Sequence, residues 1–371
     1  MSLRLAVVRD YRAEGWPSMD LCADQLLAQL PADITSVDVT PQFRQICHHL
    51  PSPRRFGFNA DRLINRHILL PRVVRRAASH ADFLHIVDHS YAHLVNAVSP
   101  GRAGVYCHDL DAFRSILEPE KEPRPWWFRR LARRILDGLK RAAVVFHSTA
   151  VVGQRLATAG IVHRERLVYA PYGVAAEFTP EATTLVELPV SINAPFLLHV
   201  GSNIPRKRLD VLLDVFAAVR LNVAGLRLVQ VGGPWPPHLA EQISRLGIGE
   251  AVTQVRNLTR EQLAELYRRA AVVLVPSEAE GFGLPVIEAL ACGAAVVASD
   301  IPTLREAGGA VVDYCAVADV AGWADTVTRV VKRSPSSPDR PARLTHAARF
   351  SWREHARIIG ETYLRLASQR Q

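Results

Sequence analysis

The stretch that decides the fold runs from Ala271 to Ser299 and reads AVVLVPSEAEGFGLPVIEALACGAAVVAS. The valine-rich apolar runs at its two ends have the length and composition of buried β-strands. Between them, residues 285–292 form an apolar segment that begins with Pro285 and is followed by Gly293, a pattern typical of a helix. The stretch therefore predicts a strand, a loop, a helix and a second strand.

The same alternation continues through the rest of the chain. Thr259 is expected to cap one helix, and leucines at a spacing of three and four residues from Leu209 predict another. In the first half, Ser18 is expected to begin a helix. Strands that alternate with helices predict doubly wound parallel sheets, here in two α/β domains that face each other across a cleft. The further expected strands are residues 5–9, 83–87, 104–107, 143–147, 196–201, 226–232 and 252–255.

Length and composition narrow the class of protein. A chain of 371 residues is long enough for roughly two domains. With 49% hydrophobic and 22% charged residues, it has the composition of a globular protein rather than a disordered one. It has no apolar run near the ~20 residues of a membrane-spanning helix, and its first residues form too short an apolar core for a signal peptide. Five scattered cysteines without a CxxC pair indicate a reducing compartment and no zinc site, so we expect a cytoplasmic protein.

The formal net charge of +9 is concentrated in two basic stretches of the first half. Residues 51–80 contain seven arginines and one aspartate, and residues 124–141 join arginines to Trp126, Trp127 and Phe128. Such charge suits nucleic acid, phosphorylated substrates or an anionic membrane surface. For the second stretch two interpretations remain open: a helix packed by its aromatic residues, or a helix in peripheral contact with a membrane.

The loop and helix after residue 276 have the chemistry of a sugar-nucleotide site. Gly281 and Gly283 allow the backbone to approach a ligand closely, and the first amides of the next helix suit a phosphate. Glu280 lies in the loop, and Glu288 lies about one turn into the helix, where it can accept hydrogen bonds from a ribose diol. Two carboxylates beside a phosphate would repel it unless hydroxyl donors meet them, and a sugar nucleotide supplies those hydroxyls.

Two segments carry a resemblance to a known family. EGFGLPVIEALACG, residues 280–293, resembles the signature of the retaining GT-B glycosyltransferases of family 4, and GSNIPRK, residues 201–207, resembles that family's second marker. The resemblance implies the GT-B fold, with two Rossmann-like domains. It places an acceptor-binding domain at residues 1–175, a nucleotide-sugar domain at 176–349 and a helix at 350–371 that crosses back to the first domain.

The resemblance also implies roles for individual residues. Arg206 and Lys207 would neutralise the diphosphate of the donor, which agrees with the usual phosphate chemistry of these side chains. Glu280 would bind hydroxyls of the transferred sugar, Glu288 would bind the ribose, and His108 would contact the 6-position of the sugar. The remaining donor-binding positions are Gly15, in the loop of residues 10–17, with Gly201 and the backbone of Phe282, Gly283 and Leu284.

The implied reaction is transfer of a hexose from a nucleoside-diphosphate sugar to a glycan or lipid-linked acceptor. The anomeric configuration would be retained without a protein nucleophile, a metal ion or a cofactor. Three positions depart from the family pattern. Arg208 stands where a small residue is common. Ser202 stands where many members have arginine, and Tyr172 replaces the usual asparagine before Gly173 and Val174.

Alternatives to this interpretation are a GT-B epimerase that acts on a sugar nucleotide and a non-catalytic basic binding protein. Family members of the epimerase type rely on other motifs, and no nucleic-acid-binding module is recognisable, so we expect no nucleic-acid partner. Asp109 and Asp111 have the spacing of a DxD metal motif, but Asp111 is expected to be a helix cap instead. His85, His89 and His93 have a spacing of four, but the first lies in an expected strand, which argues against a shared metal.

Overall fold

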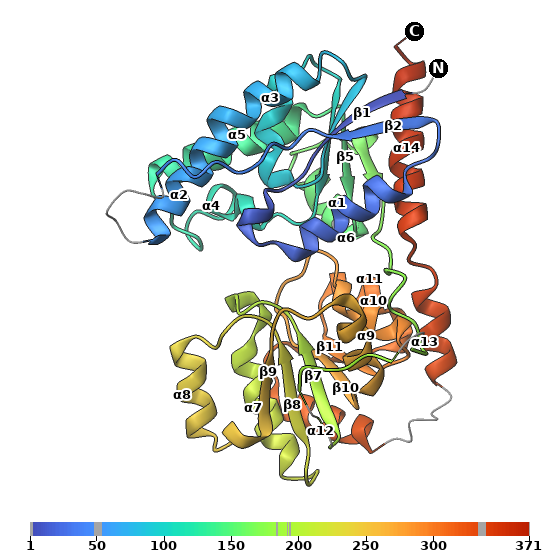
Figure 1. The fold of residues 1–371 in the computed structure, drawn as a ribbon. Coiled ribbons are helices and arrows are strands. Elements are labelled where there is room, and N and C mark those ends of the chain that lie inside the picture. Colours follow the sequence, from blue (N-terminus) through green and yellow to red (C-terminus); the bar gives the residue numbers. More distant parts are fainter. Residues whose placement is uncertain are drawn as a thin grey trace. The chain divides into compact units, whose positions relative to one another are not determined.

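The computed structural model describes residues 3–47, 54–182, 185–190, 192, 194–332 and 339–370. The chain divides into two compact units (Figure 1). Unit 1 comprises Met1–Gly173 with Trp352–Gln371, and unit 2 comprises Val174–Ser351. None of the described helices is long and apolar enough to cross a lipid bilayer.

Unit 1 is built on a six-stranded parallel sheet with the order β2-β1-β3-β4-β5-β6. The first strand therefore has the second on one side and the third on the other, so the direction of strand addition reverses between β1 and β3. The strands are β1 (Leu3–Val8), β2 (Ile34–Asp38), β3 (Phe83–Ile86), β4 (Ala103–Cys107), β5 (Val144–His147) and β6 (Leu167–Tyr169).

The helices of unit 1 cover the sheet, and the C-terminal helix is one of them. This last helix, α14 (Trp352–Ser368), packs against α1 (Pro17–Gln29). Its Tyr363 hydroxyl lies 2.9 Å from His85 Nδ1 in β3. Other helices are η1 (Arg12–Glu14), α2 (Arg54–Ile64), η2 (Asn65–Leu69), α3 (Leu70–Ala77), η3 (His89–Ala97), η4 (Asp111–Phe113), α4 (Arg114–Leu117), α5 (Trp126–Arg141), α6 (Ala150–Thr158) and η5 (Arg164–Arg166).

Unit 2 contains a second six-stranded parallel sheet, with the order β12-β11-β10-β7-β8-β9. Here the direction of strand addition reverses between β7 and β10, and ligands of open α/β sheets bind beyond the carboxyl ends of the strands at such a point. The strands are β7 (Phe196–Val200), β8 (Arg227–Val231), β9 (Val252–Val255), β10 (Val272–Val275), β11 (Val296–Ser299) and β12 (Asp313–Cys315).

The helices of unit 2 bury their apolar stripes against this sheet. In α7 (Leu209–Arg220), the stripe of Leu209, Leu212, Leu213 and Phe216 is buried, as its spacing predicts. The others are η6 (Pro205–Lys207), α8 (Pro237–Arg245), η7 (Gly249–Ala251), α9 (Arg260–Arg269), α10 (Leu284–Ala291), α11 (Pro302–Gly308), η8 (Gly309–Val311), α12 (Val320–Val331) and α13 (Asp339–Ala347).

The predicted alternation of strands and helices is confirmed in both units, while the predicted cap at Ser18 is wrong. Thr259 caps α9, and its side chain accepts a hydrogen bond from Gln262 N in a capping box. Ser18 does not cap α1, because that helix begins one residue earlier, at Pro17, after Trp16. The proline fixes φ near the helical value, so it occupies the first helical position that the serine signal obscured.

Candidate functional site

Three of the predicted site residues meet at the carboxyl edge of the sheet in unit 2. Lys207 Nζ donates a hydrogen bond to Glu280 Oε1 at 2.6 Å, and Arg206 Nη1 lies 3.4 Å from Glu280 Oε2. The Glu280 side chain is 6% exposed, whereas Arg206 is 25% exposed. Ser277 Oγ also donates to Glu280 Oε1, at 2.7 Å. A nearly buried carboxylate is therefore held between two cations, one of which keeps part of its surface in water.

The sheet topology explains why residues about 75 positions apart come together. Arg206 and Lys207 follow β7, and Glu280 follows β10, its neighbour at the point of reversal. The two loops are also joined through the backbone, because Glu278 N donates to Arg206 O at 2.9 Å. Arg206 Nη1 in turn donates to Ala279 O at 2.9 Å. These bonds fix the position of the cations relative to the loop.

Gly201 and Gly283 have local reasons to be glycine. Gly283 precedes α10 with a φ of +102°, and a Cβ there would lie 2.8 Å from Leu304 Cδ2. Gly201 ends β7, and a Cβ there would lie 3.1 Å from the imidazole of His199. Both positions keep the backbone close to its surroundings at the edge where Lys207 lies.

The start of α10 offers backbone rather than side-chain groups. No side chain caps the helix, whose first residue, Leu284, follows Gly283. The ring of Phe282 is buried against Phe350, so its backbone is the part suited to a ligand. The positive end of the helix dipole adds to the charge of Lys207 at this edge. Together these groups make an anion-binding environment.

Glu288 lies deeper in the same helix. It is 7% exposed, and Tyr267 of α9 donates its hydroxyl to Glu288 Oε2 at 3.0 Å. Burial raises the pKa of Glu288 to about 7, and the bond from Tyr267 opposes this increase. At neutral pH the group is thus divided between its neutral and ionised forms, which differ in their ability to accept hydrogen bonds from a diol.

His108 and Gly15, the other two predicted residues, belong to unit 1. His108 follows β4 and shares a hydrogen bond between its Nδ1 and the Tyr172 hydroxyl, so the departure from the family pattern at residue 172 supplies a partner to this imidazole. Among the described residues, its buried Nε2 has no partner. Burial lowers the pKa of His108 to about 4, which leaves the ring neutral at pH 7. Gly15 follows η1 with a φ of +70°, in open space.

Unit 1 has an acidic cluster at its own point of reversal. Asp10 follows β1 and Asp88 follows β3, and both are buried. The Asp10 carboxyl has no hydrogen-bond partner among the described residues. Burial and then the charge of Asp88 raise the pKa of Asp10 to about 9. Asp10 was not among the predicted site residues, although an acidic residue two positions after a buried strand was a signal that could have found it.

The possible metal ligands are grouped neither as the three histidines spaced by four nor as the DxD pair. His93 Nε2 bonds to Arg66 O at 2.9 Å, so His85, His89 and His93 do not converge. Across the described part of the chain, one group of three could hold a metal: Asp88, His89 and His108, whose ligand atoms lie within 4.8 Å of one another.

The predicted helix cap at Asp111 is wrong. Asp111 is the first residue of η4, and Leu110 occupies the cap position. It is Asp109 whose Oδ1 accepts a hydrogen bond from Asp111 N, at 3.0 Å. A carboxylate two residues before a turn can reach the backbone amide as an Asx turn does, and this local geometry moved the capping role by two positions.

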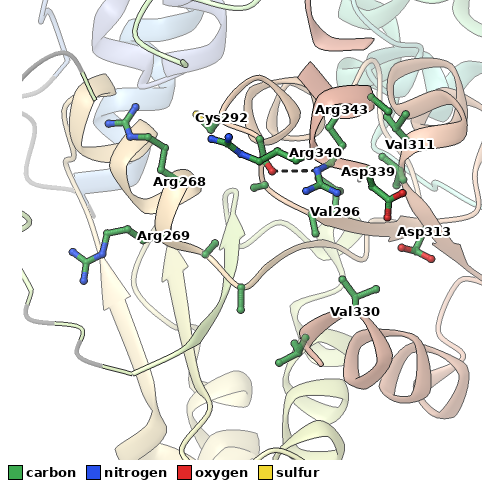
Figure 2. Close-up of a pocket in the computed structure, with 18 of the residues that line it drawn as sticks. Arg268, Arg269, Cys292, Val296, Val311, Asp313, Val330, Asp339, Arg340 and Arg343 are labelled. Atoms are coloured by element: carbon green, nitrogen blue, oxygen red, sulfur yellow. Dashed lines mark hydrogen bonds between the residues drawn. The ribbon is translucent and has the colours of Figure 1, made fainter. Parts of the chain in front are cut away.

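A separate pocket of about 700 Å³ lies at the opposite edge of the unit 2 sheet (Figure 2). Its lining includes Ala271 and Ala295, which directly precede β10 and β11. Arginines around it donate to backbone carbonyls: Arg340 to Pro180 O at 3.1 Å and Arg343 to Gly293 O at 3.1 Å. Because Lys207 and Glu280 follow the carboxyl ends of the strands, this pocket at the amino ends is not part of their site.

Comparison with known proteins identifies the family. Residues 187–349 match the family model "Glycosyl transferases group 1". This region of the chain is a glycosyl transferases group 1 domain. The chain is 34% identical over 252 residues to a D-inositol 3-phosphate glycosyltransferase of Mycolicibacterium smegmatis, which covers 64% of this chain and 55% of that protein. A protein of the same name from Segniliparus rotundus is 30% identical over 308 residues, or 76% of this chain and 66% of the relative.

The chain spans about half the length of most of the curated relatives it matches. It covers 43% and 41% of the length of two mycobacterial proteins of the same name. Solved structures show its fold. Sucrose-phosphate synthase from Thermosynechococcus elongatus matches with a TM-score of 0.72 and 17% identity over 99% of this chain and 100% of that one. Anabaena HepE in complex with UDP and glucose matches with a TM-score of 0.71 and 14% identity, at the same coverage. The two Rossmann-like units thus form a GT-B fold, as the motifs at residues 201–207 and 280–293 implied.

Proposed function

We propose that the protein is a retaining glycosyltransferase of family 4 that transfers a hexose, of the mannose or glucose type, without a metal ion. Its donor is a nucleoside-diphosphate sugar, and its acceptor is a hydroxyl of a glycan or a lipid-linked glycan. The observation that carries this proposal is the convergence of Arg206, Lys207 and Glu280 beyond the carboxyl ends of β7 and β10. The named relatives and the neighbour bound to UDP and glucose support the same class of reaction.

The geometry suggests how the cations act. During transfer the bond between the anomeric carbon and the diphosphate breaks, and negative charge grows on the leaving group. Lys207 and Arg206 stabilise this charge, and the amides at the start of α10 add to their effect. A diphosphate competes with Glu280 for the two cations, which releases the carboxylate to accept hydrogen bonds from sugar hydroxyls. Glu288 holds the ribose, and His108 contacts the 6-position of the sugar.

The absence of a protein nucleophile is part of the proposal. The acceptor oxygen attacks the face from which the diphosphate leaves, through an ion-pair-like transition state, so the configuration is retained. The proton of the acceptor hydroxyl passes to an oxygen of the departing diphosphate. The enzyme works in the cytoplasm. It needs no cofactor and does not bind nucleic acid. Peripheral contact of unit 1 with an anionic membrane would bring it to lipid-linked acceptors.

A ligand screen tests the donor assignment. Thermal unfolding is measured with UDP, GDP and ADP and with their hexose conjugates, because a ligand that binds the folded state raises the unfolding temperature by mass action. We expect one base to stabilise the protein more than the others, and its hexose conjugate to be turned over when acceptor glycans are added. Glu280→Gln should keep the nucleotide effect and lose transfer. If no nucleoside diphosphate changes the unfolding temperature, the proposal is wrong.

A further inference from the structure

Helix α5 of unit 1 exposes large aromatic side chains at its start. Trp126 is 69% exposed, Trp127 is 48% exposed and Phe128 is 36% exposed. The opposite side of the helix is buried where it packs against η3, through Ala132, Leu136 and Leu139. The aromatic residues are therefore not the ones that fix α5 to unit 1, which answers the question left open by the sequence. Exposed apolar area of this kind marks an interaction site.

The same helix is strongly basic. Five arginines and Lys140 stand against a single acidic residue, Asp137. Arg130, Arg133 and Arg134 are exposed. Together with Trp126 and Trp127 they line an open pocket with a volume of about 730 Å³. The outer surface of α5 thus combines aromatic rings at one end with a row of cations along its length.

The second basic stretch lies beside this helix. Both α3 and α5 pack against η3, and Figure 1 shows the two helices next to each other in unit 1. Burial lowers the pKa of His67, in the segment before α3, to about 4, and the positive charge of Arg134 in α5 adds to this effect. A charge of the basic stretch at residues 124–141 therefore acts on a residue of the stretch at 51–80. The end of the segment and α3 expose Ile68 (47%) and Val73 (36%). Residues 51–53 and the side chains of residues 54–56 lie outside the described residues.

We define the α3–α5 face by its exposed residues. They are Ile68, Arg72, Val73, Arg75, Arg76, Trp126, Trp127, Arg130, Arg133 and Arg134. We propose that this face binds the surface of an anionic lipid bilayer. Tryptophan rings are stable at the level of lipid headgroups, and the neighbouring cations meet the phosphates.

The mixture of side chains favours a bilayer over a nucleic acid. Aliphatic Ile68 and Val73 offer no stacking surface to a base, whereas they gain free energy when they enter the boundary of the acyl chains. The inference rests on the membrane contact of the proposed function, assigns it to named residues and holds for any acceptor. Its failure would leave the donor assignment intact, since nucleotide binding is measured in unit 2 without lipid.

Vesicle flotation tests the α3–α5 face directly. The full chain is mixed with vesicles of phosphatidylcholine alone or of phosphatidylcholine with phosphatidylglycerol, at low and high salt. We expect flotation only with the anionic vesicles, and a loss at high salt because ions screen the charges over ~8 Å at physiological ionic strength. Absence of flotation with anionic vesicles at low salt overturns the inference, as does binding to single-stranded RNA without binding to vesicles.

Two variants locate the contact. The triple variant R130E, R133E and R134E should weaken binding to anionic vesicles by at least about 100-fold, since each cation near the surface contributes ~1 kcal/mol. The double variant W126A and W127A should also bind more weakly, without a change in net charge. Circular dichroism and nucleotide binding establish that each variant is folded.

The matched control changes the same charge elsewhere. R245E, R256E and R349E replace three exposed arginines of unit 2. We expect this variant to float like the wild type. If it loses binding as much as the α5 variant does, the attraction depends on net charge alone, and the assignment of the α3–α5 face is wrong. Flotation of the tryptophan variant at the wild-type level also contradicts the face as defined.

Discussion

Units 1 and 2 each add strands on both sides of their first strand, β1 in one and β7 in the other. In unit 2, the point of reversal gathers Arg206 and Lys207 around a single carboxylate, Glu280. In unit 1, the corresponding point gathers the carboxyls of Asp10 and Asp88, both buried. The backbone geometry that collects polar residues is thus the same, while unit 2 gathers two cations and unit 1 gathers two carboxyl groups.

This difference shows which part of the site the scaffold determines and which part the ligand chemistry determines. A parallel sheet brings loop residues together at the point of reversal whatever their charge. A cationic edge suits a diphosphate, whereas an edge with buried carboxyls suits hydroxyl donors. Arginines near the cluster in unit 1 are engaged internally, because Arg66 and Arg62 share the carboxylate of Glu14. The proposed division into donor and acceptor units is consistent with this contrast.

The largest effect is expected from removing the cationic character of the unit 2 edge. Lys207→Ala should lower turnover by about 10²–10³-fold, the scale for loss of one group that stabilises transition-state charge. Arg206 and Ser277 still contact Glu280 in this variant, so the buried carboxylate keeps partners and the fold should survive. Steady-state kinetics measure the effect, with Arg245→Ala as a control for loss of one positive charge in unit 2. Turnover near the wild-type level would remove Lys207 from the mechanism.

The unit 2 site could be predicted because its parts are contiguous in the sequence. Residues 201–207 and 280–288 each follow a strand, and each contains its own glycine and charged residues. The unit 1 cluster offers no such segment. Asp10 and Asp88 are single residues after two strands, and Glu14 pairs with Arg66 across 52 positions. Only the folded sheet brings them together, so local patterns could not reveal that Arg66 is buried rather than part of a solvated basic face.

Errors at the ends of helices have a different origin. The predictions at Ser18 and Asp111 used residue type alone, and both residues are good N-caps. Caps also require a particular backbone conformation at the residue before the helix, and that conformation depends on the incoming loop. Pro17 and Asp109 determine it here. The edge strands β2, β6 and β12 were missed because most of their side chains are not fully buried, so their sequences lack the valine-rich apolar runs that mark the inner strands.

A second prediction compares the buried carboxyls of the two units through the pH dependence of stability. A carboxyl with a raised pKa binds its proton more tightly in the folded chain, so the free energy of unfolding falls as pH rises from the unfolded pKa to the folded one. For Glu288, with a pKa of about 7 against 4.5 unfolded, the fall amounts to about 3 kcal/mol. For Asp10 the fall continues to about pH 9.

Urea unfolding between about pH 5 and about pH 10 measures both effects. Glu288→Gln should lack the decrease that the wild type shows below about pH 7, and above that pH it should be the more stable protein. Asp10→Asn should already be more stable than the wild type at neutral pH, because the wild type loses stability once the unfolded Asp10 ionises above its ordinary value of 3.8, and the difference should grow until about pH 9. Curves that remain parallel to the wild type across the range would contradict the burial of ionisable carboxyls at these two positions.

The smallest expected effect is that of metal removal. If Arg206, Lys207 and the amides of α10 neutralise the diphosphate, EDTA should change turnover by less than about twofold. The group in unit 1 that could hold an ion is already engaged in hydrogen bonds. Both oxygens of Asp88 accept from Ser90, at 2.9 Å from its N and 2.5 Å from its Oγ, and His108 Nδ1 bonds to Tyr172. An ion would have to replace such bonds.

Complete loss of turnover in EDTA, restored by Mg²⁺ or Mn²⁺, would reverse the comparison, because an ion held by the carboxylates of unit 1 would then stabilise the leaving group. His89→Ala and Asp111→Asn would distinguish the two candidate ligand sets, since the first variant removes a ligand of the group with Asp88 and the second removes a ligand of the pair with Asp109.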